Sequence, residues 1–296
     1  MKIVLFEISD EERRFLAGLL EELSPIFVEE KLSQDNLSLA KDAEIISVFI
    51  NSQVDSQIIA ALPKLKLIAT RSTGYDHIDI ASAKERSVAV ANVPAYGSRT
   101  VAEFTFALIL NLSRKIFEAK HQIIESENFD ISRLQGFELC GKTIGVVGTG
   151  RIGRNVIKIA RGFEMNVIAC DSKPDADFAQ AQGFKYLPLD ELLAVSDIVT
   201  LHTPYLKETH HLINSGNIGR IKKCALLINT ARGELVETDA LLRSLTEGHI
   251  AGAGLDVLEE ERQLKEETEL LSHSPGKIKD FKTLLQNHVL INLPQV

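Results

Sequence analysis

Short apolar runs alternate along the chain with segments in which apolar residues recur at helical spacing. Several of these runs are apolar on consecutive residues and rich in Val and Ile, which indicates strands buried on both faces of a parallel sheet. The expected strands are residues 3–8, 44–50, 65–71, 88–93, 143–148, 166–171, 197–202, 225–230 and 251–257. The expected helices are residues 10–23, 55–62, 152–163, 189–195 and 238–247. This alternation predicts an α/β fold with a doubly wound parallel sheet.

One long segment interrupts the alternation. Residues 100–126 contain no Gly or Pro and keep a helical apolar stripe, so they predict one continuous helix of about 40 Å. The turn-rich residues 94–98 precede it and are typical of a hinge. We therefore expect the first domain to end at residue 98. The apolar face of the helix fits equally well a buried core helix or packing against a second copy in a homodimer.

Composition excludes several classes of protein. The 296 residues suggest two domains, and 33 Lys and Arg against 41 Asp and Glu give a net charge of −8, which is unfavourable for binding nucleic acid or an anionic membrane. No apolar run approaches the roughly 18 residues that span a bilayer, and the start MKIVLFEISDEERR lacks the basic region of a signal peptide. Three widely spaced cysteines argue against a disulfide framework and a zinc site. We expect a cytoplasmic protein without a metal.

The strongest chemical signal is the loop Gly148-Thr-Gly150-Arg-Ile-Gly153, between an expected strand and an expected helix. In a dinucleotide-binding loop, the first glycine permits the tight turn, the second lets the backbone approach a diphosphate, and the third lets the helix lie close to the strand. Asp171 follows at the end of the next strand, about 20 residues later, where an acidic residue binds the adenosine ribose. A 2′-phosphate would meet this charge, so the pattern favours NAD over NADP. The alternative is a glycine turn without a ligand.

Further motifs, taken together with the glycine loop, resemble the D-isomer-specific 2-hydroxyacid dehydrogenases, and most closely their D-lactate dehydrogenase-like branch. The motifs are STGYDHID at residues 72–79, VPAYGSRTVAE at 93–103, LHTP at 201–204, INTARG at 228–233 and GLDV at 254–257. The resemblance implies a smaller flavodoxin-like substrate domain over residues 1–98 and a Rossmann-type NAD-binding domain over residues 99–287, with the active site in the cleft between them. It also implies hydride transfer between NAD(H) and C2 of a 2-keto or 2-hydroxy acid.

Two residues match the family's catalytic positions. Arg232 matches the catalytic arginine, and its guanidinium offers a planar, permanently charged fork that fits a carboxylate. The alternative for Arg232 is a surface ion pair at a strand end. Glu261 matches the glutamate that orients an imidazole and raises its pKa. Because Glu261 ends an acidic run of three residues, its register is open by one residue, and a solvated acidic turn is the alternative.

The resemblance assigns the remaining site residues to substrate and cofactor. The expected substrate-binding residues are Thr73, Gly74 and Tyr96. The expected cofactor-binding residues are Gly148, Gly150, Arg151, Ile152, Gly153, Asp171, Thr203, Pro204, Thr209, Thr230, Ala231 and Asp256. Structural alternatives are an ordinary turn for Gly74, a hinge-packing aromatic for Tyr96 and a strand cap for Asp256. The residues His77, His202, His210 and His211 are expected to be structural or to lie on the surface.

The sequence departs from the family pattern at residues 287–296, NHVLINLPQV. The family's proton donor is a histidine in a Thr-Pro-His context after a strand, and this motif is absent. We interpret residues 288–296 as the truncated start of a return to the substrate domain, and His288 as an exposed connecting residue. Two hypotheses follow: an NAD-dependent D-2-hydroxyacid dehydrogenase whose turnover suffers without the donor, or a non-catalytic NAD(H)-binding sensor or corepressor-like module.

Overall fold

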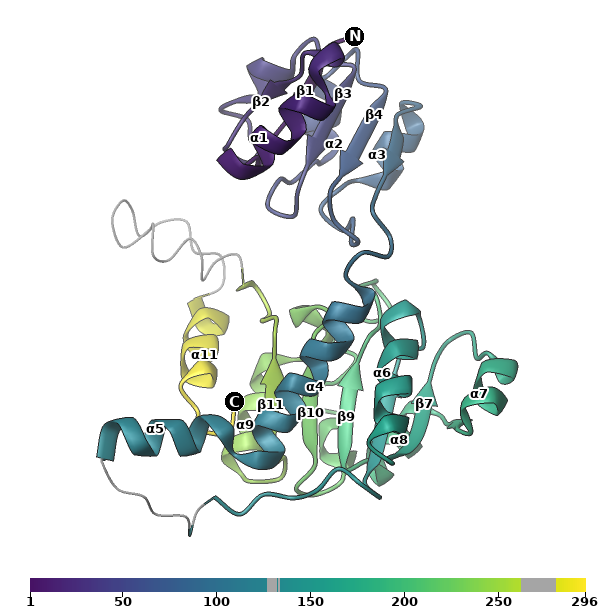
Figure 1. Ribbon diagram of the computed structural model, residues 1–296, viewed down its shortest axis with the longest axis vertical. Coiled ribbons are helices and arrows are strands. Elements are labelled where there is room, and N and C mark those ends of the chain that lie inside the picture. The colour runs from purple at the N-terminus through teal and green to yellow at the C-terminus, as the bar shows by residue number, and fades with distance from the viewer. Residues whose placement is uncertain (127–131, 133, 262–280) are drawn as a thin grey trace. The chain divides into compact units, whose positions relative to one another are not determined.

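The computed structural model describes residues 1–126, 132, 134–261 and 281–296. The chain divides into two compact units, Met1–Gly97 and Ser98–Val296. Each unit contains one parallel sheet with helices packed against it (Figure 1). The division falls at Gly97, inside the turn-rich residues 94–98.

The first unit has a five-stranded sheet in the order β2-β1-β3-β4-β5, with all neighbouring strands parallel. This is the flavodoxin-like strand order. The strands are β1 (Ile3–Leu5), β2 (Ile26–Phe27), β3 (Ile45–Val48), β4 (Leu67–Thr70) and β5 (Ala89–Ala91). The helices are α1 (Asp10–Leu19), α2 (Ser56–Ala61) and α3 (Ile80–Glu85), with 3-10 turns at Glu21–Leu23 and Leu37–Ala40. Each α-helix of this unit starts after a side chain that caps its first turn: Ser9, Asp55 and Asp79.

The second unit has a six-stranded parallel sheet in the order β11-β10-β9-β6-β7-β8. Counted within this unit, the order is that of the Rossmann fold, which reverses between β6 and β9. The strands are β6 (Thr143–Val147), β7 (Asn166–Cys170), β8 (Lys185–Tyr186), β9 (Ile198–Leu201), β10 (Leu226–Asn229) and β11 (Gly252–Leu255). Ligands of such sheets bind outside the carboxyl ends of the strands, at the point of reversal.

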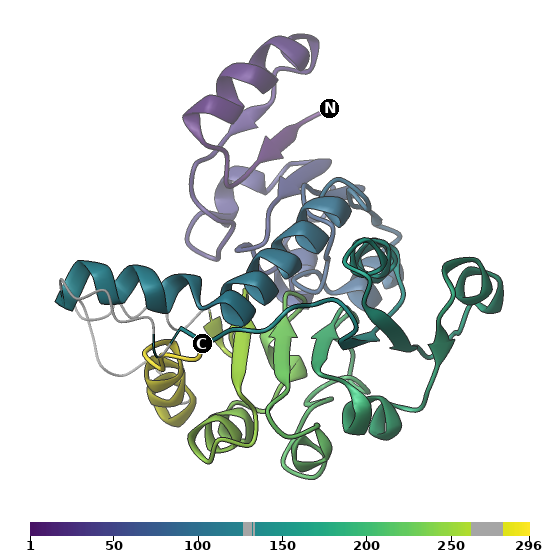
Figure 2. The same cartoon turned by 60° about the horizontal axis from the view of Figure 1, so that its bottom comes forward.

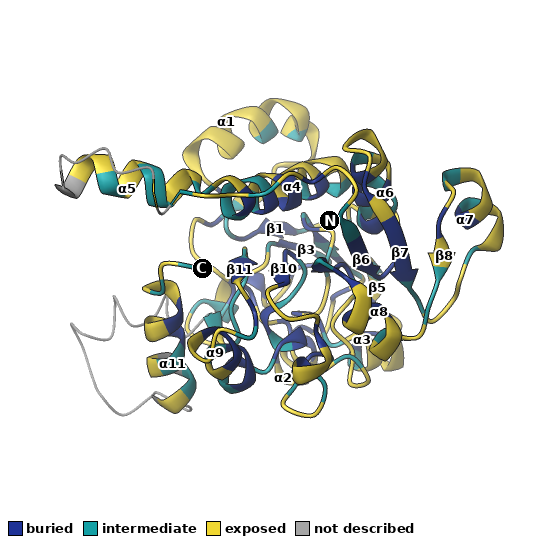
Figure 3. Ribbon diagram, turned by 90° about the horizontal axis from the view of Figure 1, so that it is seen from below, coloured by how far each residue is buried: buried dark blue, intermediate teal, exposed yellow. Residues whose placement is uncertain are grey.

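Helices cover both faces of this second sheet (Figure 3). The helices are α4 (Ser98–Arg114), α5 (Ile116–Ser126), α6 (Arg151–Gly162), α7 (Ala176–Gln182), α8 (Leu189–Val195), α9 (Thr238–Thr246) and α11 (Phe281–Ile291), with 3-10 turns at Ile218–Arg220 and Gly233–Leu235. One apolar cluster contains buried residues of α4, α6 and β6, and a second contains buried residues of α8, α9 and β10. Burial on both faces explains why the strands read as continuous apolar runs.

All nine expected strands are present, and all five expected helices are present with ends shifted by up to four residues. The sequence patterns missed β2 and β8, which have two residues each, and the helices α3, α7 and α11. Two-residue strands are too short to show an alternation or an apolar run of their own.

The expectation of one continuous helix over residues 100–126 is wrong. The chain breaks between α4 and α5 at Lys115, which adopts a left-handed φ of +57°. The Ser113 carbonyl, which would accept a hydrogen bond from Phe117 in a continuous helix, accepts one from the Phe137 N–H at 2.9 Å instead. The Phe117 N–H donates to Asn111 Oδ1 at 3.0 Å. A segment about 20 residues further along the chain therefore ends the helix.

Residues 288–296 also differ from expectation, because the structure places them in the second unit. Leu290 is buried, and Leu293 and Val296 pack against the same apolar cluster as α9. The Gln295 carbonyl accepts a hydrogen bond from the Ala253 N–H of β11 at 2.9 Å. The apolar side chains of this segment thus find their burial beside β11 and α9, and not in a return to the first unit.

Candidate active site

The three glycines of the loop after β6 have different surroundings. Gly148 has a φ of +94°, and a Cβ atom there would lie 2.7 Å from the backbone of His202. A Cβ atom at Gly153 would lie 2.0 Å from the Gly148 carbonyl oxygen. Gly150, in contrast, has no heavy atom within 4 Å of the corresponding point. Two glycines are therefore required by packing, and the third borders open space that a ligand could enter.

Helix α6 starts at this open space. Its N-cap residue is Gly150, which provides no side-chain cap. The first N–H groups of a helix have no intrahelical partner, and together with the helix dipole they favour an anion such as a phosphate. Arg151 is exposed at the helix start, while Ile152 packs against the apolar cluster of α4 and α6.

Asp171 follows β7 and is held by three hydrogen bonds. Its carboxylate accepts from the Thr149 N–H at 2.6 Å, the Thr149 hydroxyl at 2.8 Å and the Lys173 N–H at 2.8 Å. Partial burial alone would raise the pKa of Asp171, but these hydrogen bonds outweigh it and the pKa lies below its ordinary value. Asp171 is therefore ionised at neutral pH, and its remaining acceptor capacity is available to a hydroxyl group.

The segment after β9 brings two buried polar atoms beside the glycine loop. His202 accepts or donates a hydrogen bond with Thr200 Oγ1 at 2.9 Å, whereas its Nδ1 and the Thr203 Oγ1 have no partner among the described residues. Burial lowers the pKa of His202 to about 3, so its ring is neutral. An unpartnered hydroxyl next to an open helix terminus fits a polar ligand such as a dinucleotide.

Thr209 and Pro204 belong to a turn that holds itself together. Thr209 Oγ1 donates to the Pro204 carbonyl at 2.8 Å and accepts from the Leu206 N–H at 2.7 Å. Thr209 thus stabilises the turn itself, independently of any ligand that the turn contacts.

The turn that carries Arg232 is fixed by Asn229, the last residue of β10. Asn229 is 1% exposed, donates from Nδ2 to the Arg232 carbonyl at 2.8 Å and accepts from the Ala231 N–H at 3.1 Å. The hydroxyl oxygens of Thr230 and of Thr105 in α4 are hydrogen-bonded at 3.1 Å. Arg232 is half-buried, and its Nη1 donates to the Ala231 carbonyl at 2.7 Å. The guanidinium is therefore carried by a well-fixed turn at the carboxyl end of an interior strand.

The segment after β11 crosses directly against this turn. A Cβ atom at Gly233 would lie 2.1 Å from the Leu258 carbonyl, so only glycine permits the crossing. The Asp256 N–H donates to the Asn229 carbonyl at 3.0 Å. Burial raises the pKa of Asp256, and the charge of nearby Glu261 adds to the effect. Arg232, Asp256 and Glu261 are thus carried by two segments in backbone contact.

The acidic run at residues 259–261 separates into three environments. Glu259 bonds to His211 and Thr238. Glu260 is exposed and has a left-handed φ of +54°. Glu261 is half-buried and closes a turn, because its N–H donates to the Leu258 carbonyl at 3.2 Å.

In the first unit, the loop after β4 is braced by buried polar side chains. Ser72 Oγ donates to the Gly74 carbonyl at 2.6 Å, and Thr70 Oγ1 lies within hydrogen-bonding distance of both Ser72 Oγ and His77 Nε2. Thr73 Oγ1 donates to the Val93 carbonyl at 3.0 Å. The side chain of Tyr96 is 62% exposed.

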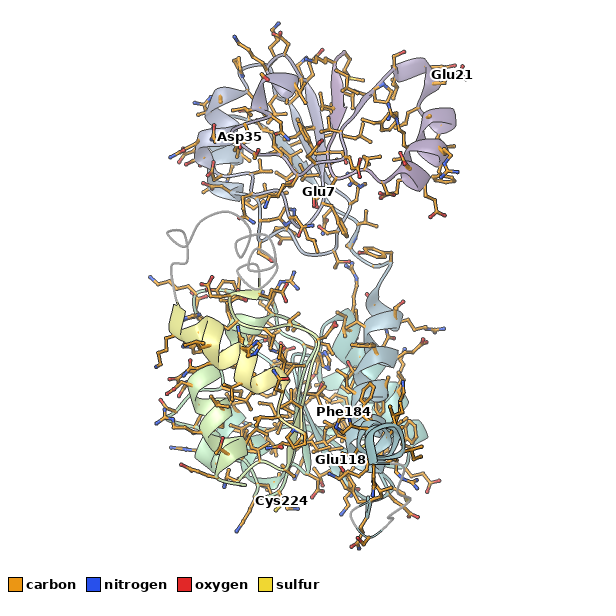
Figure 4. The ribbon with its side chains drawn as sticks, turned by 90° about the vertical axis from the view of Figure 1, so that its left-hand side faces the viewer. Glu7, Glu21, Asp35, Glu118, Phe184 and Cys224 are labelled. Atoms are coloured by element: carbon orange, nitrogen blue, oxygen red, sulfur yellow. The ribbon has the colours of Figure 1, made fainter. Side chains whose placement is uncertain are left out.

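Two charged side chains connect neighbouring strand ends of the first sheet: Glu7, which is labelled in Figure 4, and Arg71. The Glu7 carboxylate accepts from the N–H groups of Phe49, Asn51 and Ser52 at 3.0–3.1 Å. Arg71 donates to the Phe6 and Glu7 carbonyls at 2.9 and 2.6 Å. Burial tends to raise the pKa of Glu7, but its hydrogen bonds lower it overall. These contacts fix the loops at this edge.

Comparison with known proteins agrees with this architecture. Residues 106–289 match the family described as D-isomer specific 2-hydroxyacid dehydrogenase, NAD binding domain. A 2-hydroxyacid dehydrogenase homolog of Zymomonas mobilis is 38% identical over 242 residues, which cover 81% of this chain and 73% of that protein. The chain belongs to the D-isomer-specific 2-hydroxyacid dehydrogenases.

Two further members of this dehydrogenase family bear on chemistry. A glyoxylate reductase of Korarchaeum cryptofilum is 39% identical, over 75% of this chain and 68% of that protein. The D-lactate dehydrogenase of Aquifex aeolicus, solved with NAD and lactic acid, has a TM-score of 0.90 and 38% identity, and the match covers 99% of this chain and 86% of that one. The chain is thus an NAD-dependent 2-hydroxyacid dehydrogenase by family, and NAD is its cofactor.

The candidate site contains residues to which the sequence patterns assigned no role in it. Thr149 hydrogen-bonds to Asp171, and Asn229 fixes the turn that carries Arg232. The other two residues are the hydrogen-bonded pair His211 and Glu259. Asn229 stands inside the INTARG motif, so its place at the end of a buried strand was a usable signal. The others act through partners distant in sequence.

Among the described residues, no helix is long and apolar enough to cross a membrane. The same residues include no group of three or more His, Cys, Asp or Glu arranged to hold a metal ion.

Proposed function

We propose that this dehydrogenase interconverts a small 2-keto acid and the D-2-hydroxy acid, with Arg232 binding the substrate carboxylate. The observation that carries the proposal is the Arg232 turn, fixed by Asn229 and crossed by the segment that carries Glu261. A guanidinium in this place can bind a carboxylate bidentately and stabilise negative charge that develops on the reacting carbonyl oxygen. NAD(H), when bound, supplies or accepts the hydride at C2.

The proposed cofactor contacts all come from the second unit. Gly148, Gly150, Arg151, Ile152 and Gly153 would receive the diphosphate, and Asp171 would bind the adenosine ribose hydroxyls. The remaining proposed contacts are Thr203, Pro204, Thr209, Thr230, Ala231 and Asp256. The open space at Gly150 and the unpartnered Thr203 hydroxyl support this assignment. Because Asp171 is ionised, a 2′-phosphate would be repelled, and we propose a preference for NADH over NADPH.

For the first unit, we propose that Thr73 and Gly74 supply backbone N–H groups to the substrate carboxylate and that Tyr96 contacts the substrate. The braced loop over residues 70–77 supports this role, because fixed backbone dipoles bind an anion without reorganising. We propose small substrates, pyruvate or glyoxylate, because the relatives include a D-lactate dehydrogenase and a glyoxylate reductase.

Proton transfer limits the expected rate. Reduction of a ketone needs a proton at oxygen, and we propose that Glu261 orients an imidazole that provides it. The 296 residues contain no histidine in a Thr-Pro-His context. A positioned general acid contributes about 10²–10⁴-fold, so we propose that these 296 residues alone reduce a keto acid more slowly, by about this factor, than the same residues extended by a Thr-Pro-His segment.

The test is NADH oxidation with pyruvate and glyoxylate, followed by chiral analysis of the product. We expect slow formation of the D-acid, and Arg232→Ala should reduce kcat/KM by about 10²–10³-fold. The matched control is Arg220→Ala, which removes an exposed arginine paired with Asp190. Formation of the L-acid, or equal rates for Arg232→Ala and the control, would refute the proposal.

The second candidate is a non-catalytic NAD(H)-binding module, which the missing Thr-Pro-His motif favours. Tight NADH binding without turnover, both in this chain and in one that carries a C-terminal Thr-Pro-His segment from a relative, would support it. Recovery of turnover by the added segment would support the dehydrogenase.

A further inference from the structure

We propose that His211 and Glu259 form a positioning pair that holds the Arg232 turn and the Glu261 turn in register; the proposal rests on the proposed function. Neither residue is proposed to touch the substrate or cofactor. Their role is to fix the two segments on which the proposed catalytic residues are carried.

The Glu259 carboxylate connects three segments of the second unit. One oxygen accepts from His211 Nε2 at 2.5 Å, in the segment after β9. The other accepts from the N–H and the hydroxyl of Thr238, the first residue of α9, at 3.1 and 2.7 Å. The Glu259 side chain is only 14% exposed. Because the Glu259 carboxylate is largely enclosed, it is hydrogen-bonded by protein groups instead of water, and these bonds fix its position.

The main chain of Glu259 is anchored as well. Its carbonyl accepts from Asn287 Nδ2 of α11 at 2.6 Å. Glu259 therefore links α9, α11, the segment after β9 and the segment after β11.

The imidazole of His211 is held in orientation by aromatic contacts. Its ring stacks on that of His210 with centroids 3.9 Å apart and an interplanar angle of 22°. The Tyr205 ring meets His210 edge-on at 5.9 Å. The His211 N–H donates to the Glu234 carbonyl at 2.8 Å, two residues beyond Arg232. His211 is thus tied to both sides of the site, through its side chain to Glu259 and through its backbone to the Arg232 turn.

Backbone geometry indicates that the pair is under constraint. His211 has a φ of +49° and Glu260 a φ of +54°, in the left-handed region that side chains other than glycine rarely adopt. Such conformations persist only where surrounding contacts impose them. The hydrogen bond between His211 and Glu259 joins one of these positions to the residue directly before the other.

The pair reaches the proposed catalytic residues through backbone contact. A Cβ atom at Gly233 would lie 2.3 Å from the Glu259 N atom, so the Glu259 main chain packs directly against the residue next to Arg232 and supports it. A shift of Glu259 would open the turn that Glu261 closes onto Leu258. A displacement of about 1 Å at a reacting group can cost about 10²-fold in rate.

The test compares Glu259→Ala and His211→Ala with the conservative variants Glu259→Gln and His211→Gln. The matched control is Glu237→Ala, which removes another carboxylate at the start of α9, one that accepts from the Ser215 N–H at 2.7 Å. Oxamate, an unreactive analogue of pyruvate, is titrated into the NADH complex, and NADH binding is measured separately by fluorescence. Amide hydrogen exchange is followed in the chain without ligand.

We expect both alanine variants to weaken oxamate binding by about 10-fold or more. NADH affinity should fall by a smaller factor, because the glycine loop is not part of the pair, whereas Thr230, Ala231 and Asp256 lie in the two segments that it holds. Exchange should accelerate at residues 229–236 and 252–261 but not at 143–160. The glutamine variants should recover most of the loss, and Glu237→Ala should behave as the parent.

Unchanged exchange at 229–236, or a uniform acceleration over the whole second unit, would overturn the proposal, since the latter outcome means a general loss of stability. If the parent chain neither binds oxamate nor oxidises NADH, the proposed function fails. The exchange pattern still decides the positioning role in that case.

Discussion

At the scale of single residues, different glycines of the loop at residues 148–153 serve packing and ligand binding. Gly153 is enclosed by the Gly148 carbonyl, whereas Gly150 faces open space. The same substitution, Gly to Ala, therefore has different expected consequences at the two positions.

We expect Gly153→Ala to destabilise the second unit by about 3 kcal/mol, because the added methyl group overlaps backbone. Gly150→Ala should cost less than about 1 kcal/mol, since its φ of −67° suits alanine. Its NADH dissociation constant should nevertheless rise by about 10-fold, through a methyl group where the diphosphate is proposed to approach. Urea unfolding and NADH fluorescence titration measure the two effects. Equal losses of stability in both variants would contradict this division.

His202 gives the stability of the second unit a pH dependence. Its pKa is about 3 in the folded chain and about 6.5 when unfolded. Between these values only the unfolded state binds the proton, so the contribution is complete above about pH 6.5 and is lost as the pH falls towards 3. From pH 7 to pH 5 the loss amounts to about 2 kcal/mol.

His202→Gln tests this directly. The free energy of unfolding of the parent should fall by about 2 kcal/mol more than that of the variant between pH 7 and pH 5. Urea titrations at both pH values provide the comparison. A constant difference between parent and variant would mean that folding does not change the pKa of His202.

The sequence predicted those site residues that stand in contiguous motifs, such as Gly148 and Arg232. The sequence could not reveal the hydrogen bonds of Thr149 to Asp171 and of His211 to Glu259, because these partners lie 22 and 48 residues apart. Side chains that far apart in sequence meet only through the sheet order. The acidic run at residues 259–261 shows the same limit, since three identical side chains acquire three environments only after folding.

At the scale of elements, the break between α4 and α5 is imposed from outside the helix. The local sequence favours continuation, and the Ser113 and Phe117 backbone groups are redirected to Phe137 and Asn111. Periodicity cannot report such a contact. Helix α7, in contrast, has the capping residue Asp175 and a left-handed Gly183 at its two ends, so local signals for it were present.

We expect glycine to be tolerated at the break but not inside α5. Lys115→Gly relieves a left-handed φ of +57° at the expense of a half-buried ion pair with Glu118. Lys120→Gly, the matched control in the interior of α5, loses helix propensity. The two variants should differ by about 1–2 kcal/mol in unfolding free energy, with Lys115→Gly the more stable. The reverse order in urea unfolding would show that the break is not constrained by its backbone.

At the scale of the whole molecule, the two units have separate sheets and separate apolar clusters. The alternation of strands and helices predicted parallel, doubly wound packing, because burial on both faces leaves a strong pattern. The division into two domains was predicted from the chain length, from the turn-rich residues 94–98 and from the family resemblance. The place of residues 281–296 could not be predicted, since an apolar pattern does not tell which sheet the segment packs against.

NADH should stabilise only the second unit, which contains every proposed cofactor contact. At about 100 times its dissociation constant, NADH is expected to add about 2.7 kcal/mol to the unfolding of residues 98–296. Residues 1–97 should show unchanged hydrogen exchange under the same conditions. Equal protection of both units would mean that they unfold as one cooperative body.

The outermost strands of both sheets leave little main chain to which a foreign strand could add. The first sheet ends in strands of two and three residues, β2 and β5, and the second ends at the two-residue β8. At its other end, the Ala253 N–H of β11 is already taken by Gln295. Helix α5 instead projects beyond its sheet with Ile116, Phe117, Ile123 and Ile124 exposed (Figures 1 and 2). If copies associate at high concentration, we expect contact between the exposed apolar surfaces of helix α5, and not the pairing of edge strands that leads to fibrils.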